Sequence, residues 1–106
     1  MNKLLFVLFK KDGISHEQCL KEWNGEAHKS IVNKVPGLIK WTQNHVPELP
    51  NESASNGIGE LWFKDAQALQ AAMNSPEMVA AVEDAKRFLN MEKTYALIVD
   101  EKNVMK

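Results

Sequence analysis

Apolar residues recur along the chain with two spacings, and these predict four strands with helices between them. Residues 4–9 (Leu-Leu-Phe-Val-Leu-Phe) form a continuous apolar run that ends in charged residues and a glycine, which predicts a buried first strand followed by a turn. Over 38–46, polar residues nearly alternate with β-branched and aromatic ones, which predicts a strand with one polar or functional face. The remaining strands are expected at 57–63 and 94–99.

Helical spacing and capping signals occupy the segments between these strands. Residues 15–18 (Ser-His-Glu-Gln) have the spacing of a capping box, in which two side chains satisfy each other's free backbone donors. The apolar stripe that follows predicts one helix over 15–35, ended by the next Pro-Gly pair. Asp65 is expected to cap a short helix, and Ser75, followed by proline, a second one. Residues 47–56 hold two prolines and no periodicity, which predicts an exposed loop.

The predicted order of elements is strand, helix, strand, strand, two-part helix, strand. This split βαβ order is typical of the ferredoxin-like plan, an α+β fold with a four-stranded antiparallel sheet and helices on one face. We expect a single domain spanning 1–106. The uncovered face would leave an apolar patch, so we predict that two sheets pack face to face in a homodimer, a dimeric α+β barrel with a cavity between sheet and helices in each protomer.

Composition and charge exclude several classes of function. In 106 residues, 13 Lys and Arg oppose 14 Asp and Glu, so no basic field attracts nucleic acid or an anionic membrane. The first apolar run is too short for a signal peptide or a membrane span, and we expect a cytoplasmic protein. The single cysteine, Cys19, lies on the helix stripe and is expected to be a buried hydrophobe.

The sequence contains no glycine-rich phosphate loop, no nucleophile elbow and no two-histidine metal spacing. We therefore expect acid–base chemistry without a cofactor or a metal. Glu60 is one candidate, because it interrupts an apolar strand and strand alternation places it with Trp62, opposite Leu61. Desolvation on such a face would raise its pKa, as suits a general acid or base. The alternative is a structural glutamate bonded to Lys40 or across the dimer interface.

His28 is the second candidate, because it lies at the rim of the helix stripe and can reach the gap between helix and sheet. A histidine there could transfer protons near neutral pH, or it could be half-buried without a role. Asn44 and His45 are neighbours on one strand, so only one of them can point inward, and the sequence leaves open which. Three tryptophans could wall a flat apolar ligand or serve the core and interface: Trp23, Trp41 and Trp62.

The order of several motifs along the chain resembles the EthD family. They are Ser15-x-Glu17 leading to Trp23 and His28, then Pro36-Gly37-Leu38, residues 43–46 (Gln-Asn-His-Val), residues 57–63 (Gly-Ile-Gly-Glu-Leu-Trp-Phe), residues 75–77 (Ser-Pro-Glu), and Asp84 with Phe88. The resemblance implies a dimeric α+β barrel, related in fold to muconolactone isomerases, small polyketide cyclases and antibiotic-biosynthesis monooxygenases. In the lactone isomerases the helix histidine is implicated in proton transfer, which implies that role for His28.

Three functions are consistent with these features. The first is a cofactor-independent isomerase, cyclase or decarboxylase that acts on a small cyclic or aromatic metabolite of a catabolic or secondary-metabolite pathway, with His28 and Glu60 as acid and base. The second is a non-catalytic dimeric binder or accessory protein that holds a hydrophobic metabolite between tryptophan walls. The third is a monooxygenase-like oxidoreductase, in line with the label often given to the family, and it includes a haem-degrading version.

Overall fold

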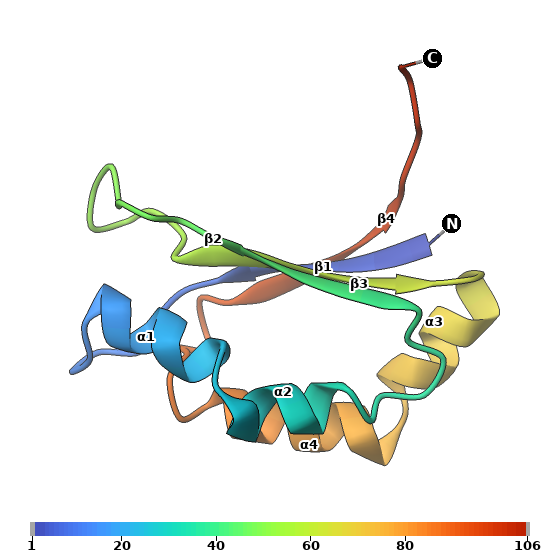
Figure 1. The fold of residues 1–106 in the computed structure, drawn as a ribbon, viewed down its shortest axis with the longest axis horizontal. Helices are drawn as coiled ribbons and strands as arrows, with labels where there is room; N and C mark the ends of the chain where they lie inside the picture. Colours follow the sequence, from blue (N-terminus) through green and yellow to red (C-terminus); the bar gives the residue numbers. More distant parts are fainter. Residues whose placement is uncertain (1, 106) are drawn as a thin grey trace.

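Four antiparallel strands form one sheet in the order β2-β3-β1-β4 (Figure 1). The computed structural model describes residues 2–105, and its strands are β1 (Asn2–Leu8), β2 (Lys40–His45), β3 (Gly57–Phe63) and β4 (Tyr95–Asp100). The helices are α1 (His16–Trp23), α2 (Glu26–Val32), α3 (Ala66–Met73) and α4 (Pro76–Ala85), and all lie on the same side of the sheet. The predicted ferredoxin-like α+β fold is confirmed.

The predicted N-caps are present at three helices. The side chains of Ser15, Asp65 and Ser75 each accept a hydrogen bond from a backbone N–H in the first turn of α1, α3 and α4 respectively. Only half of the expected capping box forms at Ser15, because the side chain of Gln18 donates to Glu22 instead of returning to the cap.

None of the helices in residues 2–105 combines the length and apolar character that crossing a membrane requires.

The single helix predicted over 15–35 is two helices, so that prediction is wrong in its continuity. Gly25 is extended (φ −75°, ψ 155°) and serves as the N-cap of α2. A Cβ at this position would lie 3.3 Å from the carbonyl oxygens of Lys21 and Glu22 at the end of α1, so the close return of the chain favours glycine. The apolar stripe did not reveal the break because both helices bury the same side, as Trp23 and Val32 show.

Strand alternation divides the sheet into a covered and an open face. On the covered face, Leu4 pairs with Leu61 and both are buried beneath the helices. On the open face, Leu5 pairs with Glu60, and Leu97 pairs with Leu5 from the other side. No helix within residues 2–105 covers this second face (Figure 1).

The core consists of two clusters of buried side chains. One contains Leu4, Val32, Val35, Leu61, Phe63, Leu69, Ala72, Met78 and Ala81. The other contains Leu8, Cys19, Trp23, Ala85, Phe88 and Leu89. Phe6 packs against both clusters, and the boundary between them is where a cavity lies.

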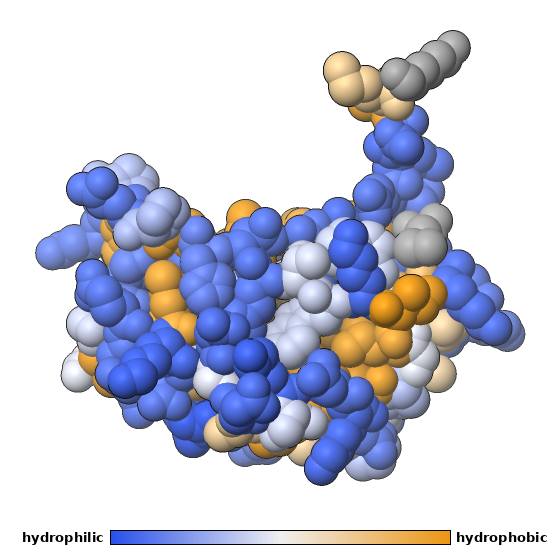
Figure 2. Space-filling view, in the orientation of Figure 1, coloured by the Kyte–Doolittle hydropathy of each residue, from blue (hydrophilic) through white to orange (hydrophobic). Residues whose placement is uncertain are grey.

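The chain after β4 leaves the sheet on its open side, and residues 101–105 extend away from the rest of the molecule (Figure 1). Glu101 is held at the root of this segment by the indole N–H of Trp62. Val104 and Met105 are 90% and 85% exposed, and Figure 2 shows apolar atoms at the far end of the segment. The rest of the surface in that view is mostly hydrophilic.

Candidate functional site

A cavity of about 60 Å³ lies between the covered face of the sheet and the helices. Its lining is formed by apolar side chains of both core clusters, with Phe6 between them. Among the described residues that line it, His28 is the one titratable group. An apolar lining with one convergent polar group is typical of small-molecule sites, and this cavity is smaller than the ~300–1,000 Å³ usual for them.

Two glycines of β3 allow Trp23 to form a wall of this cavity. The Trp23 indole lies so close to the strand that a Cβ at Gly57 would come within 2.7 Å of its Cζ3 atom, and one at Gly59 within 3.1 Å of Cζ2. Glycine is therefore required sterically at position 57 for the ring to lie on the strand, and at position 59 a side chain would make a tight contact with the ring. His45 stacks on the Trp23 ring system with ring centroids 5.0 Å apart.

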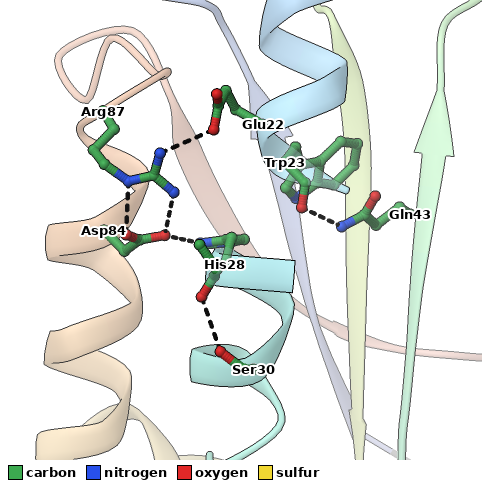
Figure 3. A network of polar contacts seen from close by, with 8 residues as sticks. Glu22, Trp23, His28, Ser30, Gln43, Asp84 and Arg87 are labelled. Atoms are coloured by element: carbon green, nitrogen blue, oxygen red, sulfur yellow. Dashed lines mark hydrogen bonds and ion pairs between the residues drawn. The ribbon is translucent and has the colours of Figure 1, made fainter. Parts of the chain in front are cut away.

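Helix α2 places His28 between two aromatic rings at the cavity. Its side chain is buried, with 5% of the residue exposed, and its ring forms T-shaped pairs with Phe88 and Trp41, with ring centroids 5.1 and 6.4 Å away. The Nδ1 atom donates a hydrogen bond to Asp84 Oδ2 at 2.9 Å (Figure 3). The ring is thus held in one orientation by packing against two aromatic rings and by the hydrogen bond from Nδ1.

Asp84 is fixed from its other side by Arg87. The guanidinium donates from Nε to Oδ1 at 2.8 Å and from Nη2 to Oδ2 at 3.0 Å, a bidentate pair that links the last turn of α4 to the segment after it (Figure 3). Its Nη1 atom also reaches Glu22 of α1 at 2.9 Å. The Arg87 hydrogen bonds, then that from His28, lower the pKa of the Asp84 carboxyl. Asp84 is therefore ionised at neutral pH.

The environment of His28 sets both its charge and its tautomer. Burial lowers its pKa below the ordinary 6.5, and this outweighs the opposite effect of Asp84. The imidazole is therefore neutral at pH 7. Because an ionised carboxylate only accepts hydrogen bonds, the proton lies on Nδ1 and the lone pair on Nε2. Nε2 makes no hydrogen bond to any residue from 2 to 105, so the arrangement can present a free base to an apolar cavity.

The covered face also contains Trp41 and His45. Trp41 lines the cavity with Trp23. His45 stacks on Trp23 and donates from Nε2 to Gln43 Oε1 at 2.7 Å, but it does not line the cavity. Burial, then the nearby His16, lowers the pKa of His45. Of the two neighbours left open by the sequence, His45 is the one on the helix side.

Asn44, Glu60 and Trp62 lie on the opposite face of the sheet, away from His28. Asn44 Nδ2 donates to Glu60 Oε1 at 2.9 Å, and Lys3 Nζ approaches Glu60 Oε2 at 2.6 Å. The ammonium groups of Lys3 and Lys40 lie over the Trp62 ring at 4.8 and 4.6 Å. The candidate residues thus form two groups separated by the sheet.

The pKa of Glu60 is lowered, so the expectation of a raised value is wrong. The hydrogen bond from Lys3 is the largest cause, and Asn44 and Thr42 add to it. The structural alternative for Glu60 fits the geometry, but its partner is Lys3 of β1 and not Lys40. An ionised carboxylate held by three donors is a poor general acid at neutral pH.

Two residues of the His28 network were not predicted as site residues. Asp84 occurs in the family motif with Phe88, and Arg87 follows it at the i+3 spacing of a helical ion pair, which was the available signal.

Cys19 is buried and burial raises its pKa to about 11, which removes the thiolate needed for nucleophilic chemistry. Within residues 2–105, no three His, Cys, Asp or Glu side chains are grouped as metal ligands would be.

Comparison with known proteins assigns the chain to a family. The profile of the EthD domain matches residues 11–92, which include His28, Asp84 and Arg87. The chain belongs to the EthD family. This EthD protein is 32% identical over 104 residues to a 4-carboxymethyl-4-methylbutenolide mutase of Pseudomonas reinekei, a match that covers 90% of this chain and 94% of the mutase.

Solved structures agree on the fold of this EthD protein. An EthD family protein of Bacillus halodurans superposes with a TM-score of 0.77 at 26% identity, covering 96% of this chain and 99% of that one. A dimeric protein with a ferredoxin-like fold from Bacteroides fragilis superposes with a TM-score of 0.69 at 16% identity, covering 94% and 95% of the two chains. The second likeness is one of fold alone.

Proposed function

We propose that this EthD protein isomerises a small cyclic metabolite by proton transfer, with Nε2 of His28 as the base. The observation that carries the proposal is the Arg87–Asp84–His28 chain of hydrogen bonds, which ends at a neutral imidazole beside an apolar cavity. Asp84 fixes the tautomer and stabilises the imidazolium that forms when Nε2 takes a proton. This division of roles replaces the pairing of His28 with Glu60.

The proposed reaction begins at a carbon next to a carbonyl group. A C–H bond breaks, the proton goes to Nε2, and the electron pair delocalises onto the carbonyl oxygen. The imidazolium then returns the proton to another carbon of the conjugated system, so the product is an isomer and no cofactor is consumed. Trp23 and Trp41 would hold the flat ring of the substrate during both steps. The mutase of Pseudomonas reinekei, whose name describes rearrangement of a butenolide, supports an isomerase that acts on a lactone ring.

We also propose that the protein is a homodimer, joined through the open face of the sheet. Support comes from Tyr95 and Leu97, which are 52% and 49% exposed on that face, and from the dimeric state named for the Bacteroides fragilis protein. The ionised network around Glu60 lies on this same face. In this arrangement Glu60 contributes to the structure of the sheet, whereas proton transfer takes place on the other side.

The test uses α-angelica lactone, an uncharged unsaturated lactone, in buffered D₂O. Nuclear magnetic resonance follows deuterium incorporation and conversion to the conjugated β isomer. We expect His28→Gln to reduce the enzyme-dependent rate by about 10²–10⁴-fold, the usual contribution of a general base. His45→Gln is the matched control, because His45 lies on the same face outside the cavity lining, and it should retain the wild-type rate. Binding without exchange in the wild type would favour the non-catalytic binder instead.

A further inference from the structure

The cavity beside His28 has no positive charge in its lining. Its lining residues within 2–105 are apolar except for His28 and Thr94, and they include no lysine or arginine. The Thr94 hydroxyl is engaged with the backbone of Phe9, from whose N–H it accepts at 3.1 Å. An anionic group of a ligand would therefore enter a space without a cation to pair with it.

The charged groups behind His28 add to this effect. Asp84 and Glu22 are two carboxylates that share one guanidinium, Arg87, so the network has an excess of one negative charge. Both forks of that guanidinium are occupied, and its side chain is 42% exposed at the surface. Arg87 is therefore engaged with these two carboxylates through three of its N–H groups, and it does not line the cavity. The excess negative charge of the network disfavours an anion nearby.

Proton transfer makes the charge of the ligand more important still. When His28 removes a proton from an uncharged substrate, an imidazolium and an enolate form together, and their charges compensate each other within the cavity. A substrate that already carries a carboxylate would leave a second negative charge unpaired there. Burial of an unpaired carboxylate is strongly unfavourable in an apolar environment.

Given the proton-transfer function proposed above, we infer that the cavity takes an uncharged ring compound, such as a neutral lactone or cyclic enone, and excludes anionic ones. This separates the chain from the mutase of Pseudomonas reinekei, whose name describes a lactone with a carboxymethyl group. The two proteins would share the base and the fold but differ in the ligand they accept. The difference rests on the lining residues of this chain.

The experiment compares a carboxymethyl butenolide with its methyl ester, which keeps the ring and removes the charge. Isothermal titration calorimetry measures the dissociation constant of each with the wild-type protein. We expect the ester to bind at least about tenfold more tightly than the carboxylate. Equal or tighter binding of the carboxylate would overturn the inference, and so would a failure of the ester to bind.

A charge placed in the lining provides an independent check. Met91 is a half-buried lining residue, so the lysine of Met91→Lys can keep its ammonium near water at the edge of the cavity. We expect this variant to shift the preference toward the carboxylate by at least about tenfold. Met91→Gln has similar length without the charge and should keep the wild-type preference. A shift of equal size in both variants would contradict the inference.

The outcomes separate this inference from the proposed function. If the carboxylate binds more tightly while α-angelica lactone is still converted in a His28-dependent way, the ligand class is wrong and proton transfer stands. If the ester binds more tightly but His28→Gln converts the lactone as fast as the wild type, the ligand class stands and the role of His28 is wrong.

Discussion

Asp84 Oδ2 lies 2.9 Å from His28 Nδ1, although the two residues are 56 positions apart in the chain. The contact joins α2 to the C-terminal part of α4, and it decides which ring nitrogen of His28 bears the proton. Because Arg87 donates a hydrogen bond to each oxygen of Asp84, the carboxylate cannot rotate away from His28 without breaking two further hydrogen bonds. The tautomer of His28 is thus set by residues that do not line the cavity.

Replacing Asp84 by asparagine should lower the rate of lactone isomerisation and shift its pH profile. An asparagine amide can donate to Nδ1 as well as accept from it, so part of the population would have its proton on Nε2 and be inactive. We expect the rate to fall by about 10- to 100-fold. The acid limb should also move to lower pH, since Asp84 raises the pKa of His28.

The control for this variant is Glu83→Gln, which removes the neighbouring carboxylate, exposed and paired with Lys86. It should leave both the rate and the pH profile unchanged. An Asp84→Asn enzyme with the wild-type profile would show that the tautomer is set in another way.

Stability should fall as pH decreases below about 6.5, because of His28. Its pKa in the folded protein is lower than the ordinary 6.5, so the unfolded chain binds a proton at pH values where the folded one does not. The contribution of neutral His28 to the free energy of unfolding is complete above pH 6.5 and is lost as pH falls toward the pKa of His28 in the folded protein. Urea unfolding at pH 7.5, 6.5 and 5.5 measures it. His28→Gln should show a shallower decline over this interval, and an identical slope would contradict the burial effect.

Glu60→Gln should leave isomerisation unchanged and reduce stability. The substitution removes the charge from a carboxylate that accepts from Lys3, Asn44 and Thr42, and we expect a loss of about 1 kcal/mol at pH 7. Because the pKa of Glu60 is lowered in the folded protein, its ionised carboxylate stabilises the fold above the ordinary pKa of 4.5. This contribution is lost as pH falls through the pKa of the folded state. A variant that loses activity but not stability would return Glu60 to the catalytic role.

Gly57→Ala should destabilise the fold through Trp23. The new methyl group would lie 2.7 Å from the indole and 2.9 Å from the carbonyl oxygen of Asn44, so the ring must move out of its site. Overpacking of this kind costs about 1–3 kcal/mol, measured by chemical denaturation. If the indole is the obstacle, the double variant with Trp23→Phe should lose less than the sum of the two single variants.

Adjacent residues of β4 test the dimer. Leu97 and Ile98 are 49% and 56% exposed but point to opposite faces of the sheet, since neighbours in a strand alternate. In light scattering at micromolar concentration we expect a dimer for the wild type and for Ile98→Glu, and a monomer for Leu97→Glu. A monomeric wild type, or dissociation by both substitutions, would contradict pairing through the open face.

The sequence predicted structure correctly where a feature depends on residues a few positions apart, such as the alternation of side chains in a strand or the cap of a helix. In β3, alternation put Glu60 and Leu61 on opposite faces, as their burial and contacts show. Caps at Ser15, Asp65 and Ser75 located helix starts because a cap depends on neighbours three residues away. The break at Gly25 was missed because the apolar stripe continues on the same side of both helices.

Periodicity and capping signals did not predict contacts between segments that are distant in the sequence. The pKa of Glu60 depends on Lys3, which reaches it only through the register of β1 on β3. The partner of His28 depends on the packing of α2 against α4, and periodicity contains no information on which residues of two helices meet. The sequence therefore located His28 as a candidate but not Asp84, and it assigned His28 and Glu60 to one acid–base pair although the sheet separates them.

The cavity between the two core clusters interrupts the hydrophobic core of this protein. Phe6 packs against both clusters and lines the unfilled space between them. A molecule seated there would complete the interior and link two separately packed halves. Recognition of the ligand and cohesion of the fold would then depend on the same few apolar surfaces, and neither could change without altering the other.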